Sequence, residues 1–261
     1  MPDESVVFDR AADYYDETRG FPDEVAGPVA EIIAKAGSLN RHSRILEIGV
    51  GTGRIALPLS RHVQAYYGID LSVPMMKRLH KKQTTERVYV AEADATQIPF
   101  ADGVFDAVIA VHVFHLIANW RDALAEAKRV LRHGALMLCC WNAGIESQAK
   151  PLHDAWHAAV PPERRALVGI DPEDDPDFAL NEGWELCGDR RVYEYDVAFI
   201  PQLHVERLRR RVWSRLWRLT DSELHKGLAA VQGAVAQLFD DPLKPLPEKE
   251  QFCVQAYRVR R

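Results

Sequence analysis

The apolar positions of the chain recur with two different spacings, and the two alternate along its first half. Short, nearly continuous apolar runs predict strands, whereas apolar residues three and four positions apart predict helices. The predicted strands are residues 43–48, 63–69, 87–94, 106–114 and 135–141, and the predicted helices are residues 23–36, 54–61, 71–82 and 120–132. Apolar strands that alternate with helices are typical of a parallel sheet covered by helices on both faces.

The second half of the chain follows another pattern. Residues 192–200 alternate between apolar and acidic side chains, and residues 251–259 form a last apolar run, so both predict strands. Further helices are expected within residues 147–172, at 203–219 and at 221–239. The whole pattern predicts an α/β fold with a seven-stranded, mostly parallel sheet and a helical insertion between strands six and seven.

Composition excludes several classes of partner. The formal net charge of −5 gives no electrostatic reason to expect nucleic-acid binding. No stretch approaches the ~18 apolar residues of a membrane span, and the acidic first residues do not resemble a signal peptide. The four cysteines lack metal-ligand spacing, so we expect no metal site and no disulfide framework. A cytoplasmic protein fits best, and the sequence does not define its oligomeric state.

Three glycines follow the first predicted strand, in the segment ILEIGVGTGR at residues 45–54. Gly49, Gly51 and Gly53 therefore lie at the carboxyl end of that strand, where ligands of open parallel sheets bind. A phosphate-binding P-loop is excluded because no lysine follows the glycines. A dinucleotide site fits poorly because the third glycine comes one residue early and Glu47 would repel a pyrophosphate.

S-adenosylmethionine (SAM) fits the same segment better, because it is a cation without phosphate. Asp70 ends the second predicted strand, about 20 residues after the glycines, where an acid can accept from both ribose hydroxyls. Asp94 ends the third strand and can accept from the adenine amino group, while the Ala95 amide can meet a ring nitrogen. Each acid alone could equally be a helix cap or a solvated strand end.

These segments resemble class I SAM-dependent methyltransferases, above all the small-molecule group that includes ubiquinone/menaquinone-biosynthesis-type enzymes. The matching segments, within residues 43–141, are LEIGVGTGR, YGIDLS, AEADATQIPFADGVFDAV and WRDALAEAKRVLRHGALML. The resemblance implies a Rossmann-like core and a cofactor site formed by Tyr15, Glu47, Gly49, Gly51, Gly53, Asp70, Leu71, Asp94, Ala95, Val111 and His112. It also implies three regions, namely an N-terminal helical cap at 1–36, a SAM-binding core at 37–145 and an acceptor-side region at 146–261, with the insertion at 203–240.

The resemblance predicts in-line methyl transfer from SAM to a small-molecule acceptor. His112 and His115 follow the fourth predicted strand and could take a proton from the acceptor, or could instead pack or orient a loop. Tyr14 and Tyr15 could cap the cofactor or pack the N-terminal helix. A methyltransferase that acts on a macromolecule and a non-catalytic SAM-binding module are the alternatives.

Two features of the second half bear on the acceptor. His153, Trp156 and His157 could line an acceptor pocket, although packing of an amphipathic helix explains them equally. The arginine-rich residues 207–218 could face an anionic substrate or a nucleic acid, or could form a solvated helix face. The negative net charge favours the solvated face.

Overall fold

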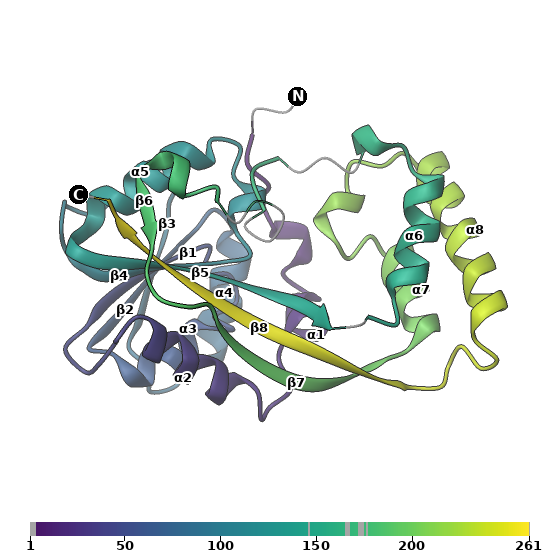
Figure 1. Ribbon diagram of the computed structural model, residues 1–261, viewed down its shortest axis with the longest axis horizontal. Helices are drawn as coiled ribbons and strands as arrows, with labels where there is room; N and C mark the ends of the chain where they lie inside the picture. Colours follow the sequence, from purple (N-terminus) through teal and green to yellow (C-terminus); the bar gives the residue numbers. More distant parts are fainter. Residues whose placement is uncertain (1–3, 146, 165–167, 172–174, 176, 261) are drawn as a thin grey trace. The chain divides into compact units, whose positions relative to one another are not determined.

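The computed structural model describes residues 4–145, 147–164, 168–171, 175 and 177–260 (Figure 1). These residues form two compact units. The first, here called the sheet unit, lies within Met1–Asn142, Val168–Tyr193 and Phe252–Arg261, and the second, the helical unit, lies within Ala143–Leu167 and Glu194–Gln251. This division differs from the three regions expected from the sequence, because residues of the N-terminal region and of the last strand belong to the same unit as the core.

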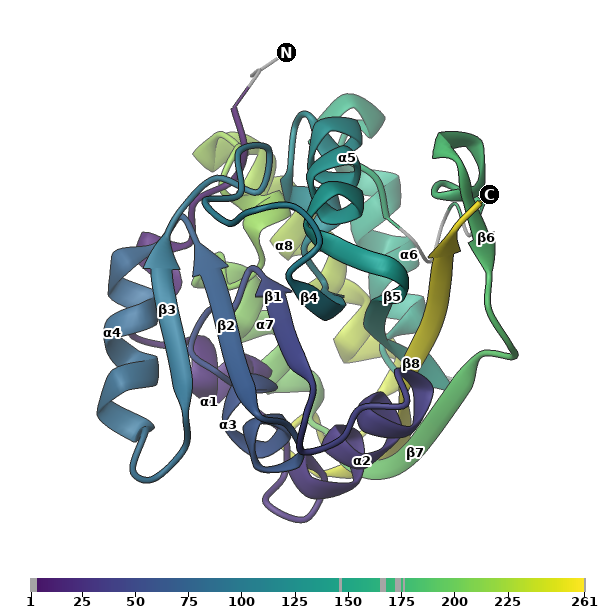
Figure 2. The same cartoon turned by 90° about the vertical axis from the view of Figure 1, so that its left-hand side faces the viewer.

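The sheet confirms the predicted α/β class. Its strands are β1 (Arg44–Ile48), β2 (Ala65–Asp70), β3 (Val88–Glu92), β4 (Phe105–Val111), β5 (Leu131–Ile145), β6 (Trp184–Leu186), β7 (Arg191–Phe199) and β8 (Leu246–Val259). The strand order is β3-β2-β1-β4-β5-β8-β6, and β7 also pairs with β8. The pairs from β3 to β5 are parallel, and Figure 2 shows β3, β2 and β1 side by side.

The strand count is one higher than predicted. The additional strand, β6, has three residues and pairs antiparallel with the end of β8. Between β6 and β7 the chain passes through Gly188, whose φ of 73° is unfavourable for other residues. Both β6 and β7 pair with β8, and the predicted strand at residues 192–200 corresponds to β7.

The helices described in the sheet unit are α1 (Tyr15–Arg19), α2 (Ala26–Ala36), α3 (Ala56–Leu59), α4 (Val73–Lys82) and α5 (Trp120–Val130). The helices α2 to α5 begin and end close to the predicted positions, and α1 lies within the expected N-terminal helical cap. Ser72 caps α4, since its side chain accepts a hydrogen bond from the Met75 N–H at 3.3 Å. The apolar faces of these helices and the central strands form the core, in which Ile45, Leu46 and Val108 are fully buried.

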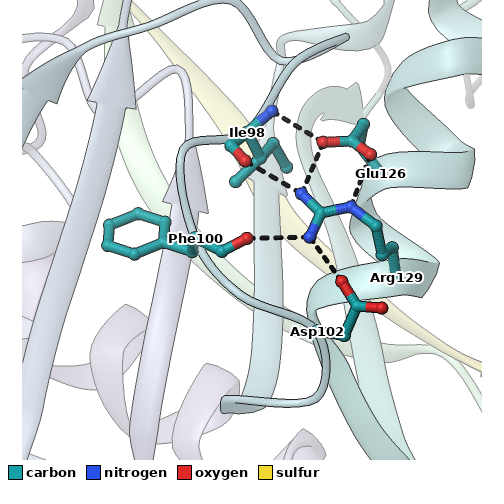
Figure 3. A network of polar contacts seen from close by, with 5 residues as sticks. All are labelled: Ile98, Phe100, Asp102, Glu126 and Arg129. Carbon is teal, nitrogen blue, oxygen red and sulfur yellow. Dashed lines mark hydrogen bonds and ion pairs between the residues drawn. The ribbon is translucent and has the colours of Figure 1, made fainter.

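A polar network fastens the connection between β3 and β4 to α5 (Figure 3). Arg129 donates hydrogen bonds to the carbonyls of Ile98 at 2.9 Å and Phe100 at 2.7 Å. The same guanidinium pairs with Asp102 at 2.8 Å and Glu126 at 2.7 Å, and Glu126 accepts from the Ile98 N–H. The Arg129 side chain thus supplies hydrogen-bond partners for backbone carbonyls of a loop that is not part of the β-sheet.

The helical unit contains α6 (Lys150–Ala159), α7 (Pro201–Arg209) and α8 (Asp221–Leu238) around its own apolar cluster. Trp156 packs closely on α8, where a Cβ on Gly227 would lie 2.4 Å from the indole ring. Thr220 and Glu223 form a capping box at the start of α8, as its sequence position predicts.

The prediction of one helix over residues 203–219 is wrong in its second half. The helix α7 ends at Arg209, and Arg211 has a φ of 52°. The guanidinium of Arg211 donates to the carbonyls of Leu216 at 2.9 Å and Leu219 at 2.5 Å, which stabilises a turn in place of helix. A short 3-10 helix, Ser214–Leu216, follows.

Candidate functional site

The glycine segment after β1 forms a tight loop. Gly49, Gly51 and Gly53 have φ values of 73°, 53° and 79°, a region that strongly favours glycine. A Cβ on Gly49 would lie 2.7 Å from Val113, and one on Gly53 would lie 2.7 Å from Leu79. A Cβ on Gly51 would meet nothing closer than 3.5 Å. Gly49 and Gly53 are therefore required by packing as well as by conformation.

Asp70, the last residue of β2, holds this loop in place. Its Oδ2 accepts a hydrogen bond from the Gly51 N–H, and its Oδ1 accepts one from the Ser72 N–H, both at 2.8 Å. Burial raises the pKa of Asp70, and these backbone hydrogen bonds oppose the rise. The structure thus joins the predicted ribose acid to the predicted glycine loop through one carboxyl group.

Glu47 lies inside the sheet and is 2% exposed. Its Oε2 accepts a hydrogen bond from the Tyr66 hydroxyl at 2.7 Å. Burial raises the pKa of Glu47 to about 8, although the bond from Tyr66 opposes the rise. Sequence reasoning missed Tyr66, because a tyrosine in an apolar strand carries no signal of a polar partner.

The predicted adenine side includes a pocket of about 310 Å³. Its lining residues come from the N-terminal segment, the end of β2 and the loops after β3 and β4, namely Glu4, Ser5, Val7, Leu71, Asp94, Thr96, Ala118 and Asn119. The Oδ1 of Asp94 accepts a hydrogen bond from the Thr96 N–H at 2.8 Å, and the neighbouring Ala95 is buried. Leu71 and Asp94, which are distant in sequence, thus share one pocket wall.

The N-terminal segment forms hydrogen bonds with the glycine loop and with the residues that follow β2. Asp9 accepts a hydrogen bond from the Ser72 hydroxyl at 2.7 Å, next to Asp70. Asp16, in α1, accepts from the Thr52 hydroxyl at 2.5 Å and pairs with Lys82 at 2.8 Å. Asp9 and Asp16 were not identified as site residues from the sequence, because their neighbours in the sequence do not distinguish them from solvated acids.

The N-terminal segment also makes aromatic and basic contacts, within itself and with the glycine loop. Tyr15 packs edge-on against Phe8, with ring centroids 6.0 Å apart. Arg54, which follows the last glycine, donates to the Arg19 carbonyl at 2.8 Å and lies 4.4 Å from the centroid of the Phe21 ring. Sequence reasoning missed both arginines, although Arg54 stands in the quoted glycine segment.

His112 follows Val111, the last residue of β4, and has a φ of 49°. Its Nε2 lies 2.6 Å from the Asn142 backbone nitrogen and 3.2 Å from the Asn142 side-chain oxygen, and its backbone N–H donates to the Cys140 carbonyl at 3.0 Å. Burial lowers the pKa of His112 to about 3, and the charge of Arg54 acts in the same direction. The low pKa favours the neutral imidazole, and Asn142 occupies its Nε2 side.

His115 lies in the 3-10 helix Phe114–Leu116, with its ring centroid 6.4 Å from that of His112. Burial lowers the pKa of His115, whereas the negative charge of Asp171 raises it. Asp171 comes from the segment whose Gly169 N–H donates to the His115 carbonyl at 3.1 Å. Nothing in the sequence indicates this approach, because the two residues are far apart along the chain.

The strand order, the glycine loop after β1 and the acid at the end of β2 are together typical of a Rossmann-like, nucleotide-binding sheet. Residues 46–139 match the family model described as a methyltransferase domain. Over this segment the chain is therefore similar to methyltransferase domains. Among its described residues, no helix is long and apolar enough to cross a membrane, and no cluster of metal-ligating side chains is found.

Relatives and solved structures agree with this family. The chain is 34% identical to a malonyl-[acyl-carrier protein] O-methyltransferase of Geobacter sulfurreducens over 59% of this chain and 59% of that protein. It is 36% identical to a demethylmenaquinone methyltransferase of Thermus thermophilus over 36% of this chain and 45% of that protein. The chain thus spans about half the length of these relatives. The structure of the YcgJ protein of Bacillus subtilis is similar in fold, with a TM-score of 0.57, 16% identity and coverage of 90% and 99%.

Proposed function

We propose that this protein transfers a methyl group from SAM to a small-molecule acceptor. The observation that carries the proposal is the partly buried carboxyl group of Asp70, which accepts a hydrogen bond from the N–H of Gly51 in the glycine loop. A second carboxyl group, that of Glu47, lies buried one strand away. The acid Asp70 beside the glycine loop fits a cationic nucleoside better than a phosphorylated one. Glu47, whose pKa is raised to about 8, is mostly uncharged near neutral pH and is suited to hydrogen bonding.

The residues around the glycine loop can each be assigned to one part of SAM. We assign the ribose to Asp70, the adenine to Leu71, Asp94 and Ala95, and the methionine end to Glu47, Gly49, Gly51, Gly53, Val111 and His112. Arg19 and Arg54 supply guanidinium groups suited to the methionine carboxylate. The N-terminal segment, including Tyr15, would exclude water from the site.

The two histidines receive different roles. SAM supplies a methyl group on a sulfonium whose departing thioether needs no proton, so a base serves only an acceptor that must lose one. His112 is poorly suited, because Asn142 occupies its Nε2 side and its pKa is about 3. We assign proton acceptance to His115, supported by the charge of Asp171, and assign to His112 the positioning of the loop after β4.

Calorimetry with S-adenosylhomocysteine (SAH) and with NAD tests cofactor binding. We expect SAH to bind and NAD to give no heat. Asp70→Asn should weaken SAH binding about tenfold to a hundredfold, because a charge-assisted hydrogen bond contributes roughly 1.5–3 kcal/mol. Asp23→Asn is the control, since Asp23 is exposed and lies outside the site. Tight NAD binding without SAH binding would contradict the proposal.

A SAM turnover assay tests the chemistry with a variant of His115. With a panel of small-molecule acceptors, His115→Gln should lower the rate of SAH formation and leave SAH affinity unchanged. A wild-type rate in that variant would remove His115 from proton transfer. SAH binding with no acceptor methylated would favour a non-catalytic SAM-binding module.

A further inference from the structure

Arg215, in the helical unit, is a positive charge without a compensating acid. It lies in the 3-10 helix Ser214–Leu216 and is exposed, yet the protein around its guanidinium disfavours the charge and lowers its pKa. Nearby arginines of the same segment are neutralised, since Arg209 pairs with Glu206 and Arg211 with Asp221. Within the described part of the chain, no carboxylate forms an ion pair with Arg215.

Two histidines and a tryptophan accompany this arginine. The guanidinium of Arg215 lies 5.8 Å from the centroid of the Trp213 ring, which is itself 5.3 Å from the ring of His204. The rings of His204 and His153 are 5.4 Å apart. These residues come from α6, α7 and the 3-10 helix, so three separate elements bring them together.

His204 has an unsatisfied polar atom. The residue is 8% exposed, and its Nε2 has no hydrogen-bond partner among the described residues. A buried nitrogen without a partner is costly, and a ligand atom would satisfy it. Burial lowers the pKa of His204 to about 3 and that of His153 to about 4, and the charge of Arg215 acts in the same direction on both.

The charges around the histidines are mostly positive. Lys150 and His157 act on His153, and Arg207 acts on His204, together with Arg215 on both. The one acid that acts on His153 is Asp154, which is paired with Lys150 at 2.8 Å. The guanidinium of Arg215 is a donor without an acid beside it, and the Nε2 of His204 is free to donate in one tautomer of the neutral ring, so the cluster suits an anion.

We propose that Arg215, His153 and His204 bind an anionic group, a carboxylate or a phosphate, of a small-molecule ligand. The inference goes beyond the proposed methyltransferase function, because the site is formed by residues of the helical unit alone. Of the arginines in residues 207–218, Arg215 therefore fits the interpretation of an anion-binding residue. Arg209 and Arg211, which are paired with acids, fit a solvated face.

Arg218 offers a matched control. It follows Arg215 by three residues and is likewise exposed, but no ring contact, ion pair or hydrogen bond involves it in the described chain. The variants Arg215→Gln and Arg218→Gln therefore remove the same charge from the same segment, and only the first removes it from the histidine cluster.

Nuclear magnetic resonance of the histidine ring signals tests the site directly. We expect inorganic phosphate or acetate, titrated separately at constant ionic strength, to shift the His153 and His204 signals saturably in the wild type and in Arg218→Gln. Arg215→Gln should weaken that binding at least tenfold. The ion that binds more tightly distinguishes a phosphate-bearing ligand from a carboxylate-bearing one.

Two outcomes would overturn the subsite, namely no saturable shift with either ion, or equal affinity in Arg215→Gln and the wild type. SAH calorimetry on the same variants separates this failure from that of the proposed function. Arg215→Gln should bind SAH as the wild type does, because the predicted SAM site lies in the sheet unit. Loss of SAH binding by the wild type would instead refute the proposed function.

Discussion

Glu47 shows at the scale of one residue how burial determines a response to pH. The pKa of this carboxyl is raised from 4.5 to about 8 in the folded protein. Between these values the folded state keeps a proton that the unfolded state has released. Because the folded state binds more protons, the free energy of unfolding falls as the pH rises through this window.

We expect the contribution of Glu47 to fall by about 1.4 kcal/mol for each pH unit within the window. Glu47→Gln cannot ionise, so its stability relative to the wild type should increase as the pH rises. Urea unfolding between about pH 5 and pH 8 measures the difference. Glu92→Gln, at an exposed acid that ends β3, is the control and should run parallel to the wild type. Parallel curves for Glu47→Gln would show that Glu47 ionises normally.

The same scale shows which site residues a sequence can reveal. The glycine spacing and the strand-end acid Asp70 are local signals, because a strand followed by a tight loop needs particular residue types there. Asp9, Arg19 and Asp171 gave no such signal. Their partners, Ser72 and the histidines after β4, lie dozens of positions away, and only the folded chain brings them together.

At the scale of secondary structure, the predictions succeeded where burial dictates the pattern. The strands β1 and β4 are buried on both faces and therefore read as continuous apolar runs. The prediction failed at residues 203–219, because apolar residues keep a helical spacing there while Arg211 bonds to carbonyls and stops the helix. The strand β6 was missed because three residues are too few to show a period.

The Arg129 network gives a prediction at this scale. Arg129→Met keeps the aliphatic part of the side chain and removes the hydrogen bonds that Arg129 donates to Ile98, Phe100 and Asp102. We expect a loss of about 1–3 kcal/mol in the free energy of unfolding, because the loop carbonyls and Glu126 lose a charged partner. Arg121→Met, on the same helix, removes an exposed ion pair with Glu182 and should cost under about 1 kcal/mol. Equal losses in chemical denaturation would show that the network contributes nothing beyond a surface ion pair.

At the scale of the whole molecule, the proposed chemistry divides between the two units. The residues assigned to SAM all belong to the sheet unit, whereas Arg215, His153 and His204 belong to the helical unit. Each unit has its own buried apolar residues, with Ile45 and Val108 in one and Leu228 and Val231 in the other. Separate cores allow separate opening, since segments open in cooperative groups that share a core.

Hydrogen exchange with and without SAH tests this division. A ligand that binds only the closed form of one unit slows exchange through the opening of that unit. With SAH at about one hundred times its Kd, we expect exchange in β1 and β4 to slow by about a hundredfold and exchange in α8 to remain unchanged. Asp70→Asn at the same SAH concentration is the control and should show much less slowing in the strands. Equal slowing in α8 would mean that the two units open together, so that cofactor binding stabilises the anion site as well.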